Sequence, residues 1–303
     1  MSNTAACLAV LGTGSDVGKS IVTTALCRIF ANRGLRVAPF KAQNMSNNSG
    51  VTPEGAEMGR AQIVQAEAAR VAPHCDMNPV LLKPVSDVGS QVVLNGVAWM
   101  DASSQSYYTK KDYLFAESCA ALDRLRRTCD LVVMEGAGSC AEVNLMAHDI
   151  VNLRMAAHAD APVILVADID RGGVFAQIVG TLACVSPEQQ RMIRGFVINR
   201  FRGDITLFTK GIDWIEQRTS KPVYGVLPWF KHFRIEAEDA VVIENAPRFN
   251  PGAESEPAIG VIRLPHISNF TDFDPLAGLP GCRLVYLQQP QDLSRMAAVI
   301  LPG

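Results

Sequence analysis

The sequence lacks the features that mark several classes of protein. Its formal net charge at pH 7 is −2, so it has no surplus of basic residues for binding nucleic acid. No uncharged apolar run approaches the roughly 20 residues that span a bilayer. The N-terminal segment has no basic region followed by a long apolar core, so it does not resemble a signal peptide. We therefore expect a cytoplasmic protein that binds neither nucleic acid nor a membrane.

Cysteine patterns that hold zinc are also missing. The chain has eight cysteines, without a C-x-x-C pair and without the cysteine–histidine spacing of a zinc site. Reduced and mostly buried thiols fit this pattern. Charged residues make up only 19% of the chain and hydrophobic residues 48%, which is typical of a well-buried globular protein and not of a disordered one.

Short apolar runs alternate with amphipathic stretches along residues 1–245. The runs predict strands at 7–11, 35–40, 131–134, 162–167, 195–199 and 222–226. The amphipathic stretches predict helices at 19–32, 57–71 and 111–127. Strands without polar alternation are typical of a parallel sheet that is covered on both faces. The predicted fold class is α/β, with a doubly wound, mostly parallel sheet.

The composition changes after this first domain. Residues 246–257 hold three prolines and a glycine and predict a linker. New strands are expected to begin at Ala258 and near Arg283, and a third is expected to end in residues 299–303. Residues 258–303 are too few to bury a full core. We expect them to be either part of a second α/β domain or an appendage of the first.

A glycine-rich segment gives the strongest functional signal in the sequence. GTGSDVGKS, residues 12–20, lies between a predicted strand and a predicted helix, which is the context of a phosphate loop. Its backbone N–H groups can surround phosphate oxygens, and the helix N-terminus adds partial positive charge. Lys19 can reach the β- and γ-phosphates of ATP, and the Ser20 hydroxyl can bind Mg²⁺. The residues expected to bind the nucleotide here are Thr13, Gly14, Ser15, Asp16, Val17, Gly18, Lys19 and Ser20.

This loop departs from the strict G-x-x-x-x-G-K-[ST] pattern. Thr13 occupies the place of the first glycine, and Gly12 and Gly14 on either side supply the flexibility instead. The alternative interpretation is an ordinary glycine-rich turn before a helix. The combination of Gly18, Lys19 and a hydroxyl residue in the strand–loop–helix context favours the phosphate loop.

Two charged residues end predicted strands at the edge where parallel sheets bind ligands. Glu135 follows an apolar run and precedes a glycine, so its carboxylate is a candidate to hold Mg²⁺ together with Ser20. Lys41 is a candidate to neutralise a transferring phosphoryl group or to hold a substrate carboxylate. For both residues, a solvent-facing position at a strand end is the alternative. Gln43 and Asn44 follow Lys41 and are candidates for the metal shell or the substrate site.

Several segments, in order along the chain, resemble the cobyric acid synthase family. These enzymes are glutamine-dependent amidotransferases of cobalamin biosynthesis. The first domain is also similar to dethiobiotin synthetase, which shares the unusual phosphate loop. The resemblance covers essentially the whole chain and rests on GTGSDVGKS, PFKAQNMSNNS, VVMEGAGS, ADAPVILVADIDRGGVFA, GFVINRFRGD, YGVLPW, IGVIRLPHISNFTDFDPL and the closing VILPG.

The resemblance implies an ATP- and Mg²⁺-dependent ligase. Family members phosphorylate side-chain carboxylates of the corrinoid cobyrinic acid a,c-diamide, and ammonia displaces phosphate from each acyl phosphate to give the b, d, e and g amides. The ammonia comes from glutamine, which a C-terminal class I glutaminase domain hydrolyses with a cysteine nucleophile. Residues 258–303 resemble the start of that domain. None of the eight cysteines lies in a G-x-C-x-G turn, so we expect no glutaminase activity from this chain alone.

The resemblance also assigns roles to residues of the first domain. Lys19, Lys41 and Glu135, proposed above from the loop and the strand ends, stay the expected catalytic residues. Asn199 would bind the adenine edge, for which an amide offers one donor and one acceptor group, and Pro228 would line the adenine pocket. A further pair, Asp170 and Arg171, would lie near the nucleotide phosphates or the substrate. The alternative for this pair is that the two side chains bind each other.

Two other functions are compatible with a phosphate loop of this kind. One is a dethiobiotin synthetase-like ligase, against which the segment around Asp170 and the C-terminal extension argue. The other is a ParA/MinD-like switch ATPase, whose loop carries an early lysine, whereas residues 12–17 contain none. Stimulation of turnover by a corrinoid, and not by a protein or DNA, would distinguish the amidoligase from the switch. The sequence gives no indication of the oligomeric state.

Overall fold

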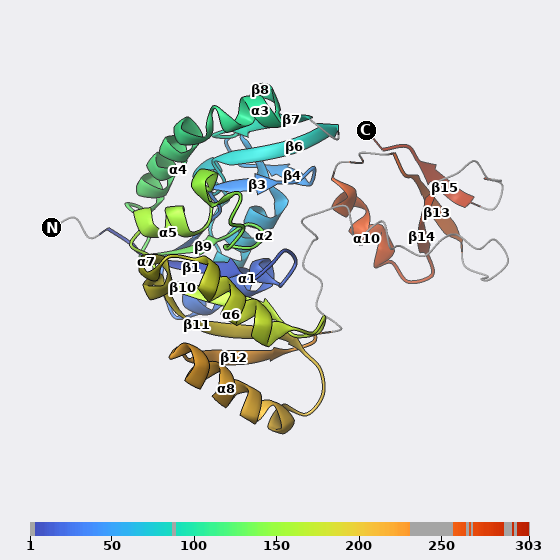
Figure 1. The fold of residues 1–303 in the computed structure, drawn as a ribbon. Coiled ribbons are helices and arrows are strands. Elements are labelled where there is room, and N and C mark those ends of the chain that lie inside the picture. The colour runs from blue at the N-terminus through green and yellow to red at the C-terminus, as the bar shows by residue number, and fades with distance from the viewer. Residues whose placement is uncertain are drawn as a thin grey trace.

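A six-stranded parallel sheet, in the order β12-β11-β10-β1-β9-β2, forms the centre of the fold (Figure 1). The computed structural model describes residues 4–86, 89–230, 257–264, 267, 269–287, 293 and 296–302. The parallel-sheet α/β class predicted from the sequence is confirmed, and each apolar run of the first domain overlaps one of these strands. Their bounds are β1 Ala6–Gly12, β2 Val37–Phe40, β9 Leu131–Glu135, β10 Val163–Asp168, β11 Ile193–Phe201 and β12 Val223–Pro228.

Helices cover both faces of this sheet, because successive side chains of a strand point to opposite sides. On one face Val10 and Val133 pack with α1 and α2, and on the other Leu11 and Leu165 pack with α4, α5 and α6. No helix among the described residues is both long and apolar enough to cross a membrane. The helices are α1 Lys19–Asn32, α2 Arg60–Ala69, α3 Ser104–Tyr108, α4 Lys111–Leu125, α5 Leu153–His158, α6 Val174–Cys184, α7 Pro187–Met192, α8 Thr209–Thr219 and α10 Asp274–Ala277.

The segment between β2 and β9 builds a second sheet, which the apolar runs did not predict. Its order is β3-β6-β7-β8, and β6, β7 and β8 pair antiparallel. Asn95 and Gly96 connect β7 to β8 with positive φ values of 49° and 83°, as a two-residue hairpin turn requires. This Asn-Gly pair is the signal by which the hairpin can be recognised in the sequence. The strands are β3 Gln43–Met45, β6 Val80–Ser86, β7 Gly89–Leu94 and β8 Val97–Ser103.

The helix predicted at 57–71 begins later than expected. Residues Glu57–Gly59 form strand β5, which pairs antiparallel with β4 (Ser49–Val51). Glu57 accepts hydrogen bonds from Lys83 (2.7 Å) and from the Ser49 hydroxyl (2.6 Å), and these contacts fix it in the strand. The helical pattern of the sequence could not reveal these partners, because both lie on other elements.

The C-terminal segment forms a three-stranded parallel sheet, β14-β13-β15, drawn in red in Figure 1. Its strands are β13 Ala258–Ile262, β14 Arg283–Leu287 and β15 Met296–Ile300. Thr271 donates a hydrogen bond to Asn48 (3.1 Å), so this segment contacts the loop before β4. Residues 231–245 and most of the predicted linker lie outside the described residues, and the division into domains stays a prediction.

We expect the substitution Leu165→Ala to lower the free energy of unfolding by about 2–5 kcal/mol, the usual cost of truncating a buried leucine. Leu165 is fully buried in β10, between β1 and β11. Leu207→Ala removes the same atoms from a side chain that is 84% exposed, and it should have little effect. Urea unfolding of both variants is the measurement. Equal destabilisation by the two substitutions would contradict the described position of β10.

Candidate functional site

The glycine-rich loop leaves the carboxyl end of β1 and leads directly into α1. Gly18 precedes the helix in a left-handed conformation (φ 96°), and no side chain caps the first helical turn. The first N–H groups of α1 therefore have no side-chain acceptor, and the helix dipole makes this end partially positive. Both properties suit an anion such as a phosphate group.

Lys19 crosses this loop and joins it to the segment that follows β9. Its ammonium group donates to the carbonyl oxygens of Gly14 (2.9 Å) and Gly138 (2.8 Å). The Cys140 N–H donates to the Gly12 carbonyl (3.0 Å), which ties the same two loops together. The predicted phosphate-binding lysine thus lies inside the loop, with its charge directed at backbone oxygens.

Ser20, Lys41 and Glu135 meet at one buried point. The Ser20 hydroxyl (2.8 Å) and the Lys41 ammonium (3.1 Å) both donate to Glu135 Oε1, and Gln65 Nε2 donates to Oε2. Glu135 is 2% exposed and Lys41 is 3% exposed, so neither faces solvent as the alternative interpretation supposed. The strand ends of β2 and β9 lie side by side in the sheet, and this adjacency brings the two charges together.

The environment of Glu135 keeps its carboxylate ionised. Burial acts to raise its pKa, but the charge of Lys41 and the hydrogen bonds from Ser20 and Gln65 outweigh burial and hold the pKa below its ordinary value of 4.5. Oxygen ligands are those that Mg²⁺ prefers. Gln65 Oε1 is a buried acceptor without a hydrogen-bond partner in the described part of the chain. A water molecule bound to the metal could donate a hydrogen bond to this oxygen. Ser20 and Glu135 therefore fit a hydrated Mg²⁺, and their role as its ligands stays a prediction.

Asn199 contacts the phosphate loop itself. Its Nδ2 donates to the Val17 carbonyl (2.9 Å), and a Cβ at Gly18 would lie only 2.0 Å from that nitrogen. A larger residue at position 18 would have to displace the Asn199 amide, and it would also be strained at the φ of 96° that Gly18 adopts. The predicted role of Asn199 at the adenine edge is not tested by this contact. Pro228, at the end of β12, is exposed, and its role in the adenine pocket also stays a prediction.

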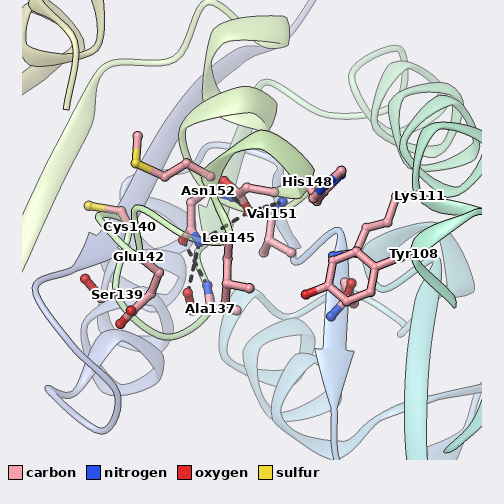
Figure 2. Close-up of a pocket in the computed structure, with 13 residues that line it drawn as sticks. Tyr108, Lys111, Ala137, Ser139, Cys140, Glu142, Leu145, His148, Val151 and Asn152 are labelled. Atoms are coloured by element: carbon pink, nitrogen blue, oxygen red, sulfur yellow. Dashed lines mark hydrogen bonds between the residues drawn. The ribbon is translucent and has the colours of Figure 1, made fainter. Parts of the chain in front are cut away.

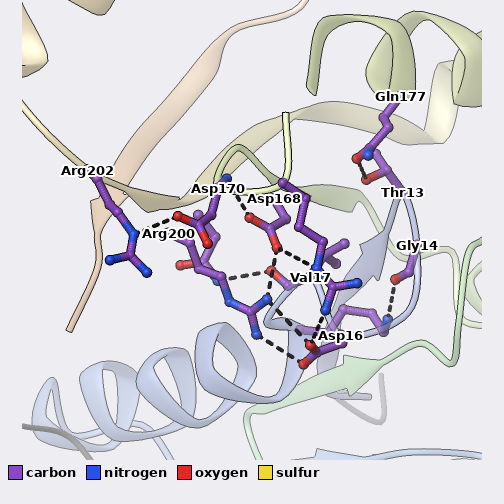
Figure 3. Close-up of polar contacts among 12 residues, drawn as sticks. Thr13, Gly14, Asp16, Val17, Asp168, Asp170, Gln177, Arg200 and Arg202 are labelled. Carbon is purple, nitrogen blue, oxygen red and sulfur yellow. Dashed lines mark hydrogen bonds and ion pairs between the residues drawn. The ribbon is translucent and has the colours of Figure 1, made fainter. Parts of the chain in front are cut away.

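Asp170 and Arg171 do not pair with each other, so that alternative is wrong. Arg202 donates to Asp170 at 2.6 Å (Figure 3). Arg171 donates to Asp16 in the phosphate loop at 3.0 Å. Arg202 lies near the end of β11, which explains why its pairing could not be expected from sequence proximity. The structure places Arg171 next to the phosphate loop, and its contact with a substrate stays a prediction.

A cavity of about 150 Å³ lies beside the phosphate loop (Figure 2). The loop after β9 forms one wall, and Tyr108 and Lys111 form another. Gln43 lines this cavity and accepts a hydrogen bond from the Tyr107 hydroxyl. Asn44 is buried, and its side-chain amide donates to Gln62 (3.1 Å). Of Gln43 and Asn44, Gln43 is therefore the one at the cavity.

Among the described residues that line the cavity, one is a lysine, Lys111, and several others are polar. The Lys111 ammonium lies 5.6 Å from the Tyr108 ring centroid, and that ring contacts His148 edge-on at 5.3 Å. Burial lowers the pKa of Lys111, and the nearby Asp149 acts in the opposite direction. Burial also raises the pKa of the Cys140 thiol to about 12, so Cys140 is protonated at neutral pH and is not a thiolate nucleophile. Lys111 and Cys140 do not stand out in the sequence, because no motif marks them.

The fold and the site together define a P-loop nucleotide-binding protein. The family model of the CobQ/CobB/MinD/ParA nucleotide binding domain (CbiA) matches residues 8–242. The chain belongs to this family.

Cobyric acid synthases are among the curated relatives of the chain. The chain is 58% identical over 299 residues to the cobyric acid synthase of Chlorobium phaeobacteroides (strain BS1), and the match covers 98% of this chain and 60% of the relative. It is 56% identical over 298 residues to that of Chlorobaculum tepidum, which covers 98% of this chain and 59% of the relative. The resemblance found in the sequence is confirmed, and the chain spans about three fifths of the length of these relatives.

A more distant likeness is to a solved structure of the signal recognition particle receptor FtsY from Elizabethkingia anophelis in complex with GDP. The TM-score is 0.44 and the identity is 16%, over 75% of this chain and 57% of that chain. This likeness is too distant to bear on function.

We expect Glu135→Gln to lower the free energy of unfolding at neutral pH by about 3 kcal/mol, because it leaves the buried Lys41 charge without its counterion. Since the folded-state pKa of Glu135 is depressed, its contribution is fully present above the ordinary value of 4.5 and is lost as pH falls through the folded-state value. The difference in free energy of unfolding between the native protein and the variant should therefore become smaller at acidic pH. Urea unfolding as a function of pH measures it.

Glu188→Gln is the control for this prediction. It breaks the exposed ion pair between Glu188 and Arg191 and should change stability little at any pH. If the difference in free energy of unfolding between Glu135→Gln and the native protein did not change with pH, the Glu135 carboxylate would not be ionised in the folded state.

Proposed function

We propose that this chain catalyses the ATP-dependent amidation of a corrinoid, which is the reaction of a cobyric acid synthase. The corrinoid would be cobyrinic acid a,c-diamide, whose b, d, e and g carboxylates become amides to give cobyric acid. The observation that carries the proposal is the identity of 58% over 98% of this chain with a protein of that name, with the predicted phosphate loop in the expected place. The geometry of the site supports the chemistry in three ways.

First, the cavity is adjacent to the phosphate loop. The hydrogen bonds from Lys19 to Gly138 and from Cys140 to Gly12 fasten the cavity wall to the loop that would hold the triphosphate. A carboxylate entering this cavity would lie beside the γ-phosphate. Positioning two reactants in this way can contribute up to about 7–11 kcal/mol to lowering the barrier in ideal cases.

Second, the charges suit phosphoryl transfer to a carboxylate. A carboxylate oxygen would attack the γ-phosphorus in line, the bond from phosphorus to the β-bridging oxygen would break, and ADP would leave. Lys19 and Lys41 would stabilise the negative charge of this step. Ser20 and Glu135 would hold Mg²⁺, which would supply positive charge to neutralise the phosphate oxygens. Ammonia would then attack the acyl carbon, phosphate would leave, and loss of a proton would give the neutral amide.

Third, the cavity offers a cation for an anionic substrate arm. Lys111 is the lysine that lines the cavity, and the aromatic face of Tyr108 beside it suits an apolar ring system. We assign Lys111 and Gln43 to binding of the acceptor. Ammonia would be supplied free or from glutamine. Residues 258–303 would be the first part of a class I glutaminase domain, and none of the eight cysteines lies in a nucleophile turn.

Membership of the family does not by itself exclude a switch ATPase, since its description includes MinD and ParA. The absence of a lysine from residues 12–17 and the identity to cobyric acid synthases favour the amidoligase. The same identity disfavours the dethiobiotin synthetase-like alternative.

We expect the purified chain, given ATP, Mg²⁺ and ammonium, to release ADP only when cobyrinic acid a,c-diamide is present. Mass spectrometry should show the corrinoid mass change that replacement of OH by NH₂ causes for each amide formed. DNA in place of the corrinoid is the control for the switch ATPase. Release of ADP that is independent of the corrinoid, with no change in corrinoid mass, would overturn the assignment of the substrate.

We expect Lys111→Met to raise the KM for the corrinoid about tenfold or more, because a hydrogen bond to a charged group contributes roughly 1.5–3 kcal/mol. The KM for ATP should be unchanged, since Lys111 lies in the wall away from the phosphate loop. Lys110→Met is the matched control, because Lys110 is exposed and does not line the cavity. If both variants behaved alike, the cavity would not be the acceptor site.

A further inference from the structure

An acidic residue lies within the phosphate loop, where it opposes the binding of an anion. Asp16 belongs to the segment that would surround the triphosphate, and its backbone is left-handed (φ 55°). Left-handed backbone at a non-glycine residue is strained and persists only where the surroundings hold it. A free carboxylate here would also repel phosphate oxygens. The structure must therefore both neutralise Asp16 and fix its conformation.

Two arginines neutralise Asp16, and they differ in their attachment. Arg171 and Arg200 each donate to the carboxylate at 3.0 Å. The Arg171 side chain is 67% exposed, whereas that of Arg200 is 21% exposed. Arg200 also donates to Asp168 at 2.8 Å, and Asp168 is buried at the end of β10 (Figure 3). Arg200 thus connects the phosphate loop to the sheet by hydrogen bonds, whereas Arg171 approaches Asp168 only at 4.0 Å.

The end of β11 holds two successive residues of the loop. Arg200 binds Asp16 through its side chain, and the neighbouring Asn199 binds the carbonyl oxygen of Val17 at 2.9 Å. Arg200 itself has a left-handed backbone (φ 60°), which is a second strained position at this contact. Two strained residues joined by an ion pair indicate that the geometry is maintained for the shape of the loop.

We propose that Arg200 is a positioning residue of the phosphate loop, which holds Asp16 against Asp168 so that the loop has its binding shape before the nucleotide arrives. Arg200 acts through Asp16 and does not need to touch the phosphates. The benefit is preorganisation, because a loop that is already ordered loses less conformational freedom on binding. The proposal rests on nucleotide binding by the family and not on the amidation reaction.

The test is a double-mutant cycle on nucleotide affinity, with Arg200→Met, Asp16→Asn and the two combined. Isothermal titration calorimetry with ATP and Mg²⁺, without any corrinoid, supplies the affinities, so failure of the proposed amidation would leave this test intact. We expect Arg200→Met to weaken binding about tenfold, within the range of coupling between contacting residues. In the Asp16→Asn background the same change should have almost no further effect. Equal losses in both backgrounds would show that Arg200 acts on the phosphates directly and would overturn the proposal.

The variant Arg200→Lys distinguishes the effect of bridging Asp16 and Asp168 from the effect of the positive charge alone. A lysine keeps the positive charge, but it lacks the forked guanidinium that reaches Asp16 and Asp168 together. We expect it to bind the nucleotide almost as weakly as Arg200→Met, and wild-type affinity would overturn the proposal. Arg194→Met, at the exposed opposite end of β11, removes the same charge and is the control that should bind like the native protein.

Hydrogen exchange without nucleotide gives an independent measure of the shape of the loop. The amides of residues 13–19 should exchange faster in Arg200→Met than in the native protein, while those of β10 should not change. Unaltered exchange in the loop would show that Arg200 does not order it, and the proposal would be wrong.

Discussion

The buried ion pair between Lys41 and Glu135 is the interaction on which the rest of the site depends. Two charges removed from water are unfavourable unless each is closely paired, because water no longer solvates them. Each therefore requires the other, and the remaining oxygen of Glu135 requires Gln65. Such pairs seldom add stability over apolar packing. The Lys41–Glu135 pair lies at the ends of β2 and β9, beside Ser20, and this position fits a role in placing charged groups at the nucleotide.

The phosphate loop is supported from both sides of the strand that precedes it. On one side, Lys19 and Cys140 join it to the loop after β9, which also forms the wall of the cavity. On the other, Asn199 and Arg200 join it to the end of β11. A loop held in this way presents its N–H groups in a fixed arrangement, and the cavity beside it keeps a fixed distance from the phosphate position.

The periodicity of the sequence predicted the parallel sheet well, because strands buried on both faces are continuous apolar runs. It predicted the second sheet poorly, since β7 and β8 are half-exposed strands in which the apolar signal is weaker. Their hairpin was nevertheless marked by Asn95 and Gly96, a pair that favours the positive φ values of such a turn. The start of α2 was misjudged because Glu57 is held in a strand by Lys83.

The sequence by itself determined the phosphate loop and the charged residues at the strand ends, because these depend on contiguous residues whose spacing is local. Only the tertiary structure decided which charges meet. Asp16 and Arg200 are 184 positions apart, and Lys41 and Glu135 are 94 apart. Their contacts follow from the order of the strands in the sheet, and local periodicity does not specify that order. Strand order is set by how the whole core packs, so the partners of each charged residue emerged only with the fold.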